Sequence, residues 1–78
     1  MNNELSANML SSVIKDLEAI ELKATTTIQM ILFNSVGIAE YTNVLDEIIT
    51  WAQKGADARD AKLFLIDKFT TTEIEKGD

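Results

Sequence analysis

The chain has 78 residues and a net charge of −6, and it contains neither cysteine nor histidine. This length fits one small domain, residues 1–78. Without these two residue types, disulfides and the usual zinc, copper and non-haem iron ligand sets are excluded, so we expect no metal and no cofactor. The acidic balance argues against nucleic-acid binding, which needs clustered Lys and Arg. It either confers solubility alone or matches a basic surface on a protein partner.

The sequence shows no sign of export or of a membrane partner. Residues 1–10 include Glu4 and no basic residue, whereas a signal peptide starts with positive charge. The longest apolar segment, Ile28–Ala39, is interrupted by Gln29 and Asn34 and is shorter than the ~20 residues that span a bilayer. We therefore expect a cytoplasmic protein.

Apolar residues in the first segment recur every three or four positions, with charged residues between them. This spacing is typical of an amphipathic helix, which we predict at residues 4–21. The apolar positions are Leu5, Met9, Leu10, Val13, Ile14, Leu17 and Ile20.

Residues Thr25–Phe33 are rich in β-favouring side chains, so their propensity alone allows a strand. Two observations favour a helix. Thr26 and Gln29 have the spacing of a capping box at a helix start. No second convincing strand exists with which this segment could pair. We predict a helix here.

Two interpretations of the middle of the chain remain open. One long helix could cover residues 25–53, because a glycine such as Gly37 costs a helix only about 1 kcal/mol relative to alanine. At ~100° per residue the apolar positions change side near Gly37, so this helix would bury two faces, one of them against a partner. Alternatively the chain breaks within residues 37–43, with Asn43 capping a separate helix.

The last predicted helix covers residues 58–69. Gly55 is suited to ending the preceding helix, and Asp57 and Asp60 have capping-box spacing at the start of a new one. Residues 70–78 are polar, and we expect a frayed tail there, with about 4–69 ordered. The predicted fold is all-α: a small antiparallel bundle of three helices, or four with a break near Gly37, completed by homo-oligomerisation.

No pattern in the sequence identifies a catalytic site, and we expect no enzyme. Ser12 and Lys15 have S-x-x-K spacing but lack the further motifs and the large domain of acylating serine enzymes. The carboxylate pair Glu18 and Glu21 lies outside any calcium-binding loop and is typical of a solvated helix face.

Two sets of residues are candidates for contacts with other chains. Few charged residues have an opposite charge three or four positions away within the predicted helices, so some could pair across an interface. Trp51 is either core or an interface anchor. The candidate oligomer or partner interface comprises Met30, Phe33, Tyr41, Val44, Ile48 and Trp51. The candidate acidic surface comprises Glu18, Glu21, Glu40 and Glu47.

These features predict a non-enzymatic protein that binds another protein as an adaptor, inhibitor or regulatory subunit. We expect it to work as a homo-oligomer, such as a dimer, through an apolar helix face rimmed by carboxylates. The alternative is a small-molecule-binding module whose ligand lies between helices or subunits. In that case Tyr41, Trp51 or threonine side chains would line the site.

Overall fold

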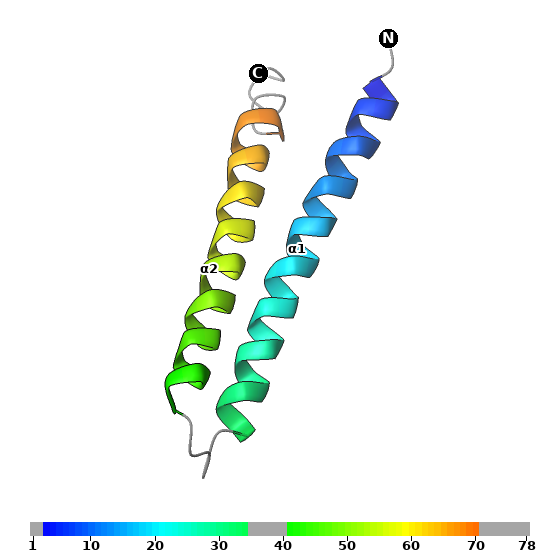
Figure 1. Cartoon of the computed structure of the whole chain (residues 1–78). Helices are drawn as coiled ribbons and strands as arrows, with labels where there is room; N and C mark the ends of the chain where they lie inside the picture. The colour runs from blue at the N-terminus through cyan, green and yellow to red at the C-terminus, as the bar shows by residue number, and fades with distance from the viewer. Residues whose placement is uncertain (1–2, 35–40, 71–78) are drawn as a thin grey trace.

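The computed structural model describes residues 3–34 and 41–70 and shows a helical hairpin (Figure 1). Helix α1 (Asn3–Asn34) is followed by helix α2 (Tyr41–Leu65), and a π-helical turn, η1 (Ile66–Thr70), continues α2. The two long helices lie antiparallel along their length. No strand occurs in either described range, so the predicted all-α class is confirmed.

The predicted division into three helices differs from the structure at both expected connections. Residues 22–24 and 54–57 are helical, in α1 and α2 respectively. The first stretch is Leu-Lys-Ala, three good helix formers, so nothing in its backbone chemistry ends a helix. The second stretch contains Gly55. This glycine is suited to a helix end, but it lies inside α2.

The predicted middle helix at 25–53 is not formed as one element. The helix that contains its first part ends at Asn34, and the next one begins at Tyr41. Gly37 and residues 71–78 of the predicted tail at 70–78 lie outside the described residues, whereas Thr70 is the last residue of η1.

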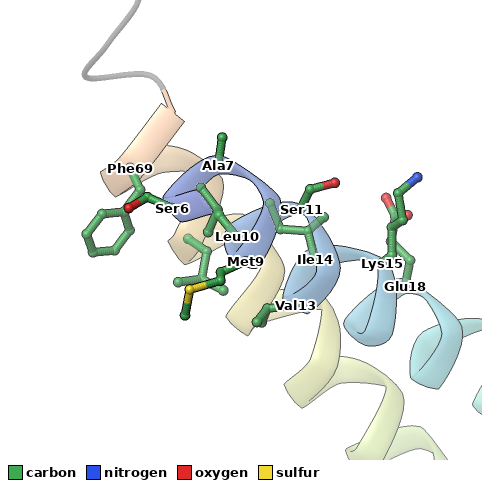
Figure 2. A pocket seen from close by; sticks show the side chains of 11 residues that line it. Ser6, Ala7, Met9, Leu10, Ser11, Val13, Ile14, Lys15, Glu18 and Phe69 are labelled. Carbon is green, nitrogen blue, oxygen red and sulfur yellow. The ribbon is translucent and has the colours of Figure 1, made fainter. Parts of the chain in front are cut away.

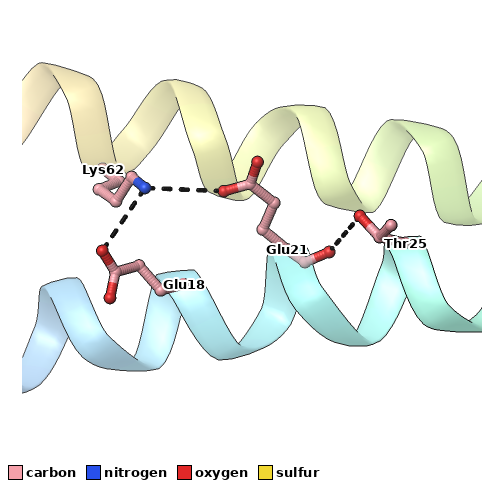
Figure 3. Close-up of polar contacts among 4 residues, drawn as sticks. All are labelled: Glu18, Glu21, Thr25 and Lys62. Carbon is pink, nitrogen blue, oxygen red and sulfur yellow. Dashed lines mark hydrogen bonds and ion pairs between the residues drawn. The ribbon is translucent and has the colours of Figure 1, made fainter.

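The threonine-rich stretch is part of α1, as predicted. The hydroxyl of Thr25 donates a hydrogen bond to the carbonyl oxygen of Glu21, one turn earlier, at 3.0 Å (Figure 3). At the end of the helix, the side-chain amide of Asn34 donates to the carbonyl oxygen of Met30 at 2.9 Å.

The two helices meet along one seam whose positions alternate by four and three residues. This heptad spacing is that of an antiparallel coiled coil. The α1 positions are Leu10, Ile14, Leu17, Glu21, Ala24, Ile28 and Ile31, and the α2 positions are Val44, Ile48, Trp51, Gly55, Ala58, Lys62 and Leu65; all are buried or half-buried.

The helices approach each other closely where small residues occupy the seam. A Cβ atom built on Gly55 would lie 3.0 Å from the Cβ of Ala24, tighter than almost all real Cβ contacts. Ala24 and Ala58 are 2% and 5% exposed, and they are the only buried apolar residues in the described part of the chain. We call this constriction the waist. It explains the mid-helix glycine, because a side chain at position 55 would push α1 away.

Candidate interaction surface

The hairpin leaves most of its large apolar side chains in contact with solvent. The radius of gyration is 17.6 Å, whereas a compact domain of 78 residues has a value of about 11.5 Å. The exposed large apolar residues are Leu5, Met9, Val13, Ile20, Leu22, Met30, Leu32, Phe33, Leu45, Ile49, Leu63, Phe64 and Phe69. Exposed apolar area of this kind is typical of surfaces that contact another molecule.

One side of the hairpin carries a shallow groove beside the waist. The groove holds about 170 Å³, and its lining includes Thr25 from α1 and Ala52, Ala56 and Arg59 from α2. These four residues therefore lie on the same side of the seam. At ~100° per residue, further side chains of both helices fall on this side. We call the set the alanine face: Ser11, Glu18, Leu22, Thr25, Gln29, Leu32, Leu45, Ile49, Ala52, Ala56, Arg59 and Leu63.

Trp51 lies in the seam, where it lines the shallow groove and also contacts two lysines of the opposite side. The ammonium nitrogens of Lys54 and Lys23 lie 4.6 Å and 5.8 Å from the centre of a Trp51 ring, one from each helix. Both distances permit cation–π attraction. By the same angular spacing, Met9, Asp16 and the rest of one α1 stripe fall on this side. We call the set the tryptophan face: Met9, Val13, Asp16, Ile20, Lys23, Met30 and Lys54.

A basic residue in the seam is matched by two carboxylates from the other helix. Lys62 of α2 lies between Glu18 and Glu21 of α1, at nitrogen–oxygen distances of 3.6 Å and 3.7 Å (Figure 3). The lysine side chain is 20% exposed and that of Glu18 is 54% exposed, so water screens the interaction. These contacts fix the helix register more than they stabilise the fold.

A wider groove lies at the end where α1 begins and α2 ends. The helices diverge there (Figure 1), and the space between and beside them amounts to about 720 Å³. Figure 2 shows Leu10, Ile14 and Phe69 among its mostly apolar lining, with Lys15 and Glu18 at one edge. Its volume falls within the range of small-molecule sites, which is about 300–1,000 Å³.

The structure separates the residues of the predicted oligomer or partner interface. Val44, Ile48 and Trp51 lie in the seam and pack towards α1 of the same chain. Met30 and Phe33 remain exposed, Phe33 to 84%, near the end of α1 that leads to the connection. Tyr41 is the first residue of α2, and its side chain lies outside what the structure describes.

The predicted acidic surface is divided in the same way. Glu18 and Glu21 form ion pairs with Lys62 of their own chain. Glu47 is exposed on α2, and Glu40 lies outside the described residues. Glu21 has no opposite charge three or four positions away in its own helix, and it thus finds a partner on the neighbouring helix; Glu18, which has Lys15 at that spacing, contacts the same lysine.

The described ranges 3–34 and 41–70 contain neither a metal site nor a membrane-spanning helix. Within these ranges, no group of three or more Asp, Glu, His or Cys side chains could hold a metal ion. No helix there has the length and apolar character needed to cross a membrane.

Sequence reasoning missed the seam and the alanine face. Both follow the same signal, an alternation of three and four residues sustained along α2. The seam stripe begins at Val44, and a second stripe begins one residue later at Leu45. Counting apolar residues together with Ala and Gly would have revealed both stripes.

No protein-family model, curated protein or solved structure matches this chain. Any functional conclusion therefore rests on the surface described above, on its shape, its apolar area and its charges.

Proposed function

We propose that this chain is a non-enzymatic interaction module that works as a homo-oligomer and binds another protein. The observation that carries the proposal is the incomplete burial of the hairpin. Its only buried apolar residues in the described ranges are two alanines at the waist, whereas leucine, isoleucine, methionine and phenylalanine side chains are exposed on several sides.

The solvent-accessible area of the chain can be compared with that of a compact monomer of the same mass. A compact monomer of 8.7 kDa exposes about 4,700 Å², so this chain, with 6201 Å², exposes roughly 1,500 Å² more. A stable protein–protein interface buries about 800 Å² per partner. One interface with a second copy thus covers about half of the excess.

Thermal unfolding tests the homo-oligomer. Circular dichroism melts are recorded over an about hundredfold range of chain concentration, because the Tm of an obligate oligomer rises with concentration. A rising Tm supports the proposal. A Tm that is independent of concentration, together with full helicity, contradicts it.

The partner-binding part of the proposal centres on Phe33 and Met30, with Glu47 as the nearest exposed carboxylate of the predicted acidic set. An exposed aromatic side chain beside a flexible methionine is a suitable anchor for another protein. Affinity capture with the native chain should retain a protein that the Phe33→Glu variant does not. Direct titration of that purified protein should then show the same difference. Equal binding by both chains places the contact elsewhere.

A second candidate function, the binding of a small apolar molecule, is favoured by the groove at the open end. Its apolar lining from Leu10, Ile14 and Phe69 suits a hydrophobic ligand, and Lys15 could pair with an acidic group. Titration with the fluorescent probe anilinonaphthalene sulfonate tests it. Saturable binding that Ile14→Glu abolishes favours a ligand site, whereas no saturable binding opposes it.

A further inference from the structure

We infer that a second copy of this chain packs on the alanine face, with a twofold axis parallel to the helices. Helix α1 of each copy then lies against α2 of the other, and the four helices form an up-down-up-down bundle. The inference rests on the proposed homo-oligomer and specifies its face, its alignment and its charge contacts.

The alanine face is the side on which α2 repeats the pattern of the seam. Its stripe alternates by four and three residues, as the seam does, and lies about 100° further around the helix. The positions are Leu45, Ile49, Ala52, Ala56, Arg59 and Leu63, with one charge among them. A helix that carries two such stripes at roughly a right angle has the form needed for two neighbours in a four-helix bundle.

The waist determines which residues of two copies would meet. Ala24 contacts Gly55 across the seam, and the two helices run antiparallel. The residue n positions before Ala24 in α1 therefore lies at the same height along the hairpin as the residue n positions after Gly55 in α2. A twofold axis parallel to the helices leaves heights unchanged. Each α1 residue therefore faces the α2 residues of the partner copy at its own height.

At equal heights, large side chains face small ones. Leu22 is 67% exposed and lies level with position 57, next to Ala56 of the partner copy. The shallow groove beside the waist, lined in part by Ala52 and Ala56, is at this height and provides the space for a leucine side chain. Nearer the connection, Leu32 comes opposite Leu45.

The charges of the alanine face are also complementary in this alignment. Glu18 lies level with position 61, which brings Arg59 of the partner copy within one turn. Each dimer contains this contact twice. Glu18 already contacts Lys62 of its own chain on the seam side, so the carboxylate would lie between two cations.

Other pairings of two hairpins match less well. With the twofold axis turned perpendicular to the helices at the waist, α1 faces α1 of the partner copy and Glu18 lies level with position 30, next to Leu32. No charged residue of that helix lies within one turn of this position. On the tryptophan face, one of the two helices offers mainly charged groups near the waist, Lys54 and Asp57. The alanine face joins the exposed apolar residues Leu45, Ile49 and Leu63 of α2 with Leu22 and Leu32 of α1, whereas Met9, Val13, Ile20 and Met30 of α1 lie on the tryptophan face.

A charge exchange between copies tests the geometry. Glu18→Arg and Arg59→Glu are made separately, and dissociation constants are measured by analytical ultracentrifugation for each variant and for their equimolar mixture. Each homodimer then has two like-charged contacts, and we expect its Kd to rise about tenfold or more. In the mixed dimer both contacts again join opposite charges, so the Kd should return to near the native value.

The mixture separates this effect from damage to the hairpin. The Lys62 contact to Glu18 is lost in the Arg variant whether or not the other chain is present, so recovery on mixing has an intermolecular cause. Circular dichroism confirms that each variant is helical. Ile20→Glu, an equally radical change on the tryptophan face, is the matched control and should leave the Kd unchanged.

The possible outcomes distinguish the inference from the function on which it rests. Weakened single variants with recovery on mixing support the twofold arrangement. A native dimer whose mixture does not recover, or that Ile20→Glu dissociates, overturns the arrangement and leaves the homo-oligomer standing. A native chain that is monomeric at every concentration overturns both.

Discussion

Enlarging Gly55 should destabilise the hairpin although it removes a glycine from the middle of a helix. A Cβ at this position would already lie 3.0 Å from the Cβ of Ala24, so the additional atoms of a leucine have no space unless the helices separate. Overpacking of this kind costs about 1–3 kcal/mol, and the better helix propensity of leucine returns somewhat less than about 1 kcal/mol. We expect Gly55→Leu to lower the unfolding free energy by about 1–2 kcal/mol.

Thermal melts followed by circular dichroism provide the assay, at one fixed chain concentration. A loss of about 1–2 kcal/mol corresponds to a fall in Tm of roughly 5–15 °C for a domain of this size. Gln53→Leu, an exposed position on the same helix, is the matched control and should change the Tm little. If Gly55→Leu is as stable as Gln53→Leu, the waist is not a close contact and the reasoning from it is wrong.

Three further predictions follow from individual contacts. Thr26→Ala, at an exposed position of α1, should raise the unfolding free energy by about 0.5 kcal/mol, because alanine is the better helix former; a loss in chemical denaturation would argue against the helix there. Lys62→Gln removes the ion pair with Glu18 and should lower the unfolding free energy by only about 0.5 kcal/mol, because the Glu18 side chain is largely exposed and water screens the pair. The difference should shrink in high salt. A difference insensitive to salt would show that packing is responsible. Lys54→Met should shift the fluorescence emission of Trp51 and weaken folding by about 0.5 kcal/mol; an unchanged spectrum would exclude the ring contact.

The helical class could be predicted because its signals are local. The apolar spacing from Leu5 to Ile20 concerns neighbouring residues of one helix. The capping-box spacing at Thr26 predicted a helix start that is wrong, because Thr26 lies inside α1 (Asn3–Asn34). The hydrogen bond from Thr25 to Glu21 shows why threonines are accommodated in α1, since a hydroxyl finds a carbonyl one turn earlier. Single-helix reasoning is adequate for such features.

The number and limits of the helices could not be predicted in the same way. Gly55 has the properties of a helix terminus when α2 is considered alone, and only the proximity of Ala24 explains it inside the helix. Likewise, the sequence pattern could not assign Trp51 to core or interface, because that depends on which helix lies opposite. These are tertiary properties, and they override local preference.

The interface candidates illustrate the same limit. Val44 and Ile48 were grouped with Met30 and Phe33 because a continuous helix would place them on one side. Since α1 ends at Asn34 and α2 begins at Tyr41, the two groups belong to different helices, and the first faces the seam. The assignment of Met30 and Phe33 to a contact with another chain stays a prediction.

The mass of the native chain in solution tests the central claim most directly. Light scattering after size exclusion, repeated over a dilution series, compares it with the chain mass of 8.7 kDa. The proposed twofold bundle predicts twice that mass at high concentration, with dissociation only on strong dilution. A mass of one chain at every concentration, with helicity retained, would show that the hairpin is stable with its apolar faces uncovered and would contradict the proposal.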